Sequence, residues 1–223
     1  MRKLFKLFYV LIFVSITFAQ ENEKSEATWI NKKFLENVVN LKSVYNALQN
    51  IDIVELQIPK SRNGGMIMGD FDYLDYDSLK QIDKNKYVFH NYNSDTLFFN
   101  GNYELVLYNK SLNRKLSFVK IKNLEKNLSS ELLVGEYLNQ DNAKVIFSAN
   151  YFTINDETIK YEISKYFKFI EFDFIQLEDE ERTIYAFTKS KDELKFYKTF
   201  ETEEYVHLFK EERPFLILRR ISE

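Results

Sequence analysis

From residue 28 onward, the hydrophobic pattern of the chain has two successive periods, and the change between them places the first elements. Apolar residues recur every three or four positions from Ile30 to Leu48, with charged residues between them, which predicts an amphipathic helix. Thr28 is the N-cap that we expect for this helix. The period becomes two over residues 54–58, and Pro59 ends the run, so a strand should follow.

Short runs rich in aromatic and β-branched residues continue through the first half. They predict strands over residues 66–68, 87–90, 96–99, 103–108 and 116–121. Asn100-Gly101 is a strong hairpin signal between two of these runs. We therefore predict one lobe over residues 28–122, in which the N-terminal helix packs on an antiparallel meander.

The second half has the pattern of an all-β structure. Residues 122–130 are the candidate seam between two lobes, and a second lobe is predicted over residues 131–223. Its predicted strands cover residues 145–154, 158–164, 167–177, 183–188, 194–200, 205–210 and 215–219, with charged turns at 178–182 and 190–193. Spacing this short is typical of sandwiches and barrels. The expected fold is mainly β, with a second lobe that is barrel-like or a sandwich.

The N-terminus has the features of a secretory signal peptide over residues 1–19. A basic start is followed by an apolar run from Leu7 to Phe18, which is shorter than the roughly 20 residues that span a bilayer. Thr17-Phe18-Ala19 fits a cleavage site, so the mature chain is expected to begin at Gln20, with a disordered leader over residues 20–27. An uncleaved N-terminal anchor is the alternative.

Composition narrows the compartment and the class of function. The chain has no cysteine, so bacterial lipid anchoring after the signal, disulfides and thiolate catalysis are excluded. The 31 basic and 34 acidic residues are mixed along the chain, which argues against a nucleic-acid partner. With 5 glycines, no phosphate-cradling loop or dinucleotide motif is present. We expect an exported protein, in the periplasm or outside the cell, with no transmembrane anchor after cleavage and no cofactor.

The order of motifs in the second half resembles that of a known family. Leu133-Val-Gly-Glu-Tyr137, then Val145-Ile-Phe147, then the segment 183–197 resemble the succession of elements in small lipocalin-like barrels of exported bacterial proteins, over about residues 132–210. That family begins with a Gly-x-Trp strand, and Tyr137 stands here at the tryptophan position. The resemblance implies a barrel that either holds an apolar ligand in its mouth or is filled by side chains.

Four aspartates form the densest acidic group in the sequence: Asp70, Asp72, Asp75 and Asp77. Clustered carboxylates suit hard cations, but Leu74 and Asp75 stand where an EF-hand loop needs a ligand and a glycine. A solvated strand edge is the favoured interpretation. The same acids are the candidates if the protein is a hydrolase.

The other candidate residues are few. His90 and His207 are the 2 histidines, too few for a three-histidine zinc site, and both are expected to be strand residues. Trp29 is expected to cap the core where the helix meets the sheet.

The aromatic segment 166–174 places Phe172 and Phe174 in alternation with Glu171 and Asp173. The two phenylalanines are expected either to line a cavity or to fill the core, and core filling is favoured.

These observations assign no catalytic, cofactor-binding or metal residue and leave the ligand-binding residues open. The leading hypothesis is a noncatalytic exported protein that binds a small apolar ligand or another component of the envelope. The alternatives are an exported hydrolase that uses carboxylates, most plausibly on a saccharide, and a structural or adhesion module.

Overall fold

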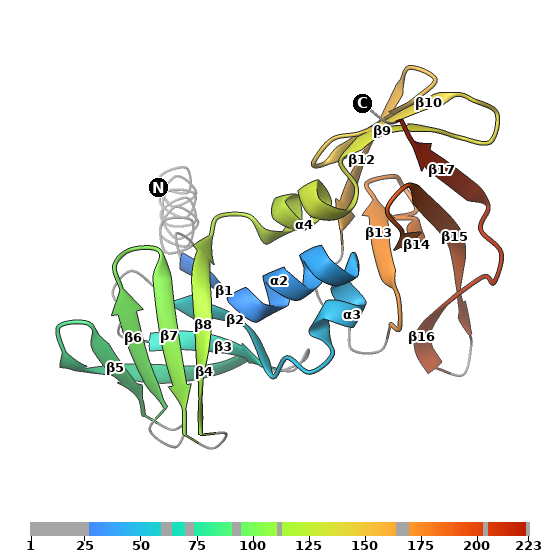
Figure 1. Ribbon diagram of the computed structural model, residues 1–223. Helices are drawn as coiled ribbons and strands as arrows, with labels where there is room; N and C mark the ends of the chain where they lie inside the picture. Colours follow the sequence, from blue (N-terminus) through green and yellow to red (C-terminus); the bar gives the residue numbers. More distant parts are fainter. Residues whose placement is uncertain are drawn as a thin grey trace, which may run out of the picture. The chain divides into compact units, whose positions relative to one another are not determined.

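A computed structural model describes most of the chain (Figure 1). The described residues are 27–58, 64–69, 74–90, 95–110, 113–163, 170–202 and 205–221. For residues 27, 64–69, 74–77, 201–202 and 205–207, only the backbone is described. The predicted signal peptide therefore lies outside the described residues. The chain is mainly β, as the sequence predicted, and forms two compact units.

The first sheet is a closed barrel in which eight strands follow one another in chain order. The strands are β1 (Ala27–Asn31), β2 (Ile53–Ile58), β3 (Gly64–Gly69), β4 (Leu74–Asp83), β5 (Lys86–Phe89), β6 (Thr96–Asn100), β7 (Glu104–Asn109) and β8 (Arg114–Ile121). The predicted antiparallel meander is thus confirmed. Asn100 pairs with Glu104 at the β6–β7 hairpin, and Gly101 in its turn has a φ of 72°, which favours glycine.

Aromatic residues fill the core of the first unit. Trp29 is 3% exposed and makes an edge-to-face contact with Phe99, at 5.7 Å between ring centroids. Tyr87 meets the same Phe99 ring at 5.4 Å. Trp29 is a core residue, as expected, but it lies in strand β1 and not at the start of a helix.

The predicted N-terminal helix is present but broken in two, and both parts belong to the second compact unit. Helix α2 (Lys32–Leu41) begins after Asn31, whose side chain accepts a hydrogen bond from the Lys33 amide; Asn31, and not Thr28, is the N-cap. Lys42 then takes the left-handed conformation, with a φ of 53°. Ser43 caps a second helix, α3 (Val44–Leu48), by accepting from the Asn46 amide. This local bond starts a new helix and thereby interrupts the predicted one, although the apolar residues keep their helical spacing.

The second sheet is built from nine strands and closes on itself. They are β9 (Gly135–Leu138), β10 (Lys144–Phe147), β11 (Tyr151–Ile154), β12 (Glu157–Ile163), β13 (Asp173–Leu177), β14 (Ile184–Lys189), β15 (Glu193–Thr202), β16 (Tyr205–Lys210) and β17 (Leu216–Arg220). Neighbours in sequence pair from β9 to β15, and β17 pairs with both β15 and β9, so eight strands form a ring. Strand β16 pairs with β15 outside that ring. The barrel-like second lobe is confirmed.

Two segments of the second half differ from the sequence prediction. Residues 145–154, expected as one strand, form β10 and β11, joined by a turn. The predicted seam contains helix α4 (Leu124–Leu132). Asn123 is its N-cap, and the Asn123 side chain accepts a hydrogen bond from the Lys126 amide. Leu124, Leu128 and Leu132 are buried on one face of this short helix. A four-residue spacing in a polar segment was too weak a signal to predict it.

The register of the second barrel separates an inward face from an outward face. Val145, Phe147, Tyr161 and Ile163 are buried and alternate with exposed neighbours, so they define the inward face. The ring of Phe147 lies within 5.9 Å of four aromatic rings, those of Tyr137, Phe152, Tyr161 and Phe196. Aromatic side chains therefore fill the middle of this barrel.

Candidate functional site

The acidic cluster of the sequence does not form a described site. Asp70 and Asp72 lie outside the described residues, and Asp75 and Asp77 are backbone partners of Ile67 and Gly65 in the β3–β4 ladder. Within the described parts of the chain, no three acidic or histidine residues are placed to hold a metal ion.

The two histidines lie in different compact units of the chain. His90 is exposed just after β5, and its amide donates to the Ser78 carbonyl at 3.0 Å. His207 lies in β16, where only the backbone is described. The structure brings neither histidine into a site.

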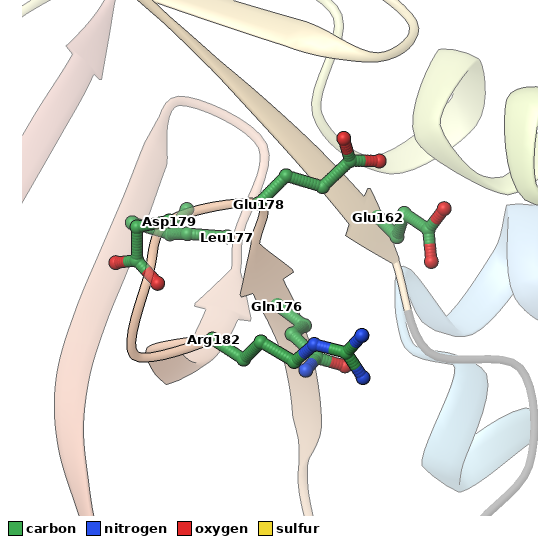
Figure 2. Close-up of a pocket in the computed structure, with 6 residues that line it drawn as sticks. All are labelled: Glu162, Gln176, Leu177, Glu178, Asp179 and Arg182. Carbon is green, nitrogen blue, oxygen red and sulfur yellow. The ribbon is translucent and has the colours of Figure 1, made fainter.

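A pocket of about 360 Å³ lies on the outer side of strands β12 and β13 (Figure 2). It is lined by Glu162, Gln176, Leu177, Glu178, Asp179 and Arg182. Glu162 and Gln176 face each other in the ladder, and the other charged residues come from the turn between β13 and β14. Sequence reasoning identified this segment only as a charged turn, because a pocket on a barrel wall depends on strand pairing.

Hydrogen bonds within the turn fix the direction of its side chains. Asp179 accepts from both the amide and the hydroxyl of Thr183, at 2.8 and 2.6 Å. Arg182 has a φ of 52°, and its amide donates to the Asp179 carbonyl. Figure 2 shows the Asp179 and Arg182 side chains leaving the turn in opposite directions. The turn thus presents one guanidinium group and several carboxylates around a small polar pocket.

The electrostatics of this pocket do not match those of an acid–base pair. Lys160 and Glu178 form an ion pair, and this hydrogen bond raises the pKa of Lys160. The bonds from Thr183 lower the pKa of Asp179, so this carboxylate stays ionised. A general acid needs a carboxyl pKa raised toward the working pH. The pocket is therefore suited to hold a small polar or charged group.

One end of the second barrel is closed by helices. The Tyr137 hydroxyl donates to the Leu133 carbonyl at 2.8 Å, at the C-terminus of α4. Tyr161 is hydrogen-bonded to Ser129 of the same helix, and burial raises the pKa of Tyr161 to about 12. The N-terminus of α3 also contacts this end, where the Asp173 carboxylate accepts a hydrogen bond from the Tyr45 amide at 2.8 Å.

Phe174 is a buried core residue, as the favoured expectation had it, but it lies on the opposite side of the barrel wall from Asp173. Asp173 pairs with Phe187, which pairs with Phe196, so the aspartate faces inward and Phe174 faces outward. Phe174 is nonetheless only 5% exposed. It is a buried residue on the outer side of the barrel and does not line its interior, while Phe172 precedes the strand.

The opposite end of the barrel carries inward-facing apolar side chains that are only half-buried. The register places Phe152, Ile154, Ile159, Tyr185 and Leu216 on the same face as the buried core. The Tyr185 ring also lies 4.9 Å from that of Phe215, which is 41% exposed. We call the first five residues the apolar mouth. Phe152 stacks on Phe147 at the edge of the aromatic cluster, and the other four lie beyond it at the rim. The exposed Glu157 and Lys198 lie on the same face of the sheet.

The fold thus defines a mainly β protein with two barrels. No family model, curated protein or solved structure matches the chain. In the parts of the chain that the structure describes, no helix has the length and apolar character needed to cross a membrane. The second barrel, with its apolar mouth and its exposed surface, carries the features that bear on function.

Proposed function

We propose that this chain is a noncatalytic exported binding protein, and that its second barrel binds a small apolar ligand at the apolar mouth. The observation that carries the proposal is the set of five inward-facing apolar residues that remain half-buried at one end of a closed barrel. Apolar area left in contact with water is a source of binding free energy, at about 25 cal/mol per Å² covered.

We expect such a ligand at the rim, because side chains fill the middle of the barrel. Phe147 and Tyr161 occupy the middle, with ring centroids 5.7 Å apart, so the ligand stacks above them and does not enter deeply. The helices α3 and α4 close the other end, which leaves one direction of approach. A short or flat apolar molecule fits this arrangement better than a long chain.

The resemblance to lipocalin-like barrels agrees with this proposal. Eight strands close in an up-and-down order, and Gly135-x-Tyr137 lies in the first of them, β9. The proposal also includes that the second barrel is lipocalin-like, that residues 1–19 are a signal peptide and that the protein is exported.

A second candidate is contact with another envelope component, and the β15–β16 hairpin favours it. Phe200 and Phe209 stack at 5.9 Å and are 48% and 44% exposed. Phe200 lies in β15 and Phe209 in β16, the strand outside the barrel ring, and an exposed aromatic pair of this kind is typical of a protein contact surface. Loss of partner co-purification in a Phe200→Ser, Phe209→Ser variant is the corresponding test.

The ligand proposal is tested by competition for a fluorescent apolar dye, with a panel of small apolar molecules. Ile159→Lys places a charge in the apolar mouth, and Ile146→Lys places the same charge on the outward face, where Ile146 is 39% exposed. We expect Ile159→Lys to abolish dye displacement and Ile146→Lys to leave it unchanged, with circular dichroism confirming that both variants fold. Equal binding by both variants would exclude the mouth as the site.

A further inference from the structure

The strand register brings the cationic side chains of Lys189 and Arg220 to the helix-closed end of the second barrel, and the charge of Lys42 acts on Lys189. Lys189 faces inward, since it pairs with Leu194, which pairs with the fully buried Leu218. Arg220 lies two residues beyond Leu218 and pairs with the buried Tyr137. Lys42 is the C-cap of α2. We call Lys42, Lys189 and Arg220 the cationic end.

Contacts with the α4 helix and with β9 locate these groups. The Lys189 ammonium donates to the Glu131 carbonyl at 3.3 Å. Arg220 Nε lies only 3.5 Å from where a Cβ on Gly135 would stand, so the guanidinium reaches the start of β9. Burial and the nearby charges of Arg220 and Lys42 lower the pKa of Lys189 to about 8. The charges of Arg220 and Lys42 therefore act on the Lys189 ammonium.

The opposite charges nearby do not balance this cluster. Glu131 is the carboxylate whose charge acts on Lys189 among the described residues. Glu193 is paired with Lys195 at 3.2 Å, and Glu136 is paired with Lys144 at 2.8 Å. The C-termini of α2 and α4 together supply about one negative charge in partial charges. Roughly one positive charge remains in excess, with Lys42 and Lys189 half-buried and Arg220 exposed.

We propose that the cationic end binds a dianionic oxyanion of the phosphate class. Two amines and one guanidinium on three separate elements can each donate to a different oxygen of a tetrahedral anion. A dianion offsets the mutual repulsion of the cations better than a single carboxylate does. The site lies at the end of the barrel opposite the apolar mouth, so it does not depend on the ligand proposed there.

Calorimetric titration of the full chain with inorganic phosphate at constant ionic strength tests the proposal. We expect Lys189→Met to weaken phosphate binding by about tenfold or more, as for loss of one charge-assisted hydrogen bond. Lys42→Met and Arg220→Met should act in the same direction. Lys191→Met removes the same charge from an exposed position in the next turn and should leave the dissociation constant unchanged.

A second readout keeps the test valid if Lys189→Met folds poorly. Nuclear magnetic resonance should show the pKa of Lys189 rising when phosphate is added to the wild-type protein, because the anion favours the charged ammonium. Tighter binding of glycerol phosphate than of inorganic phosphate would support the site and identify an organic phosphate or headgroup as its source. Equal affinities for glycerol phosphate and inorganic phosphate would support the site and identify free phosphate as its ligand. An unchanged Lys189 pKa, or equal phosphate affinity in Lys189→Met and Lys191→Met, would overturn the proposal.

Discussion

The buried carboxylate of Asp173 is a sharp test of how the second unit is held together. Asp173 is 8% exposed and accepts hydrogen bonds from the amides of Val44 and Tyr45 and from the Ser43 hydroxyl. Asp173→Ala removes these acceptors from the first turn of α3. Loss of a helix cap costs about 0.5–2 kcal/mol, and a buried donor left without an acceptor costs about 1–3 kcal/mol. We therefore expect Asp173→Ala to lower the free energy of unfolding by about 2–4 kcal/mol.

Asp173→Asn separates the hydrogen bonds from the charge. The side-chain oxygen of asparagine can still accept a hydrogen bond from the Tyr45 amide, so we expect the free energy of unfolding to fall by only about 1 kcal/mol. Burial raises the pKa of Asp173, and this effect outweighs its three hydrogen bonds. The folded protein then binds the proton more tightly than the unfolded chain does. The contribution of Asp173 to stability is therefore largest at low pH and decreases as pH rises through the raised pKa.

Urea unfolding followed by far-ultraviolet circular dichroism, at several pH values, measures these effects. Asp192→Ala removes an exposed carboxylate from the same barrel and is the matched control. Hydrogen exchange of the Tyr45 amide gives a local readout and should become faster in Asp173→Ala. Equal free energies of unfolding for Asp173→Ala and Asp192→Ala, or unchanged hydrogen-exchange protection of the Tyr45 amide, would contradict this role of Asp173.

Three further changes probe other parts of the fold. Phe147→Ala removes the ring that contacts four others and should cost about 3–5 kcal/mol in urea unfolding, against less than about 1.5 for Phe147→Leu. Gly101→Ala meets no atom within 4 Å but must keep a φ of 72°, so it should cost about 1 kcal/mol; no loss of thermal stability would contradict this. Because the pKa of Lys189 is lowered to about 8, wild-type stability should gain from this residue as pH rises from 8 to 10, and Lys189→Met should lack that gain.

The strand-rich fold was predictable because alternation and turn residues are local signals. The Asn100-Gly101 hairpin and the inward set of Ile159, Tyr161 and Ile163 follow directly from the sequence. The break between α2 and α3 was not predicted, although Ser43 is a typical N-cap residue. The apolar residues keep their helical spacing across the break and conceal it.

The sites were harder to predict because they depend on contacts between distant segments. Asp173 and Tyr45 are 128 residues apart, and only the closed barrel brings them together. Alternation along the segment 166–174 suggested that Asp173 lies opposite Phe172 and Phe174, on the side away from the core. In the structure, Asp173 faces inward and caps helix α3 at the end of the barrel. The pocket around Arg182 and the cationic end at Lys189 likewise arise from strand register, which the order of charged residues along the chain does not reveal.

Native mass spectrometry of the protein, produced with its own N-terminal segment and recovered from outside the cytoplasm, would detect a ligand bound at the apolar mouth. We expect a mass above that of the polypeptide, released on denaturation, present in Ile146→Lys and missing in Ile159→Lys. A bare polypeptide mass for the wild type, unchanged after incubation with the panel of apolar molecules, would contradict it.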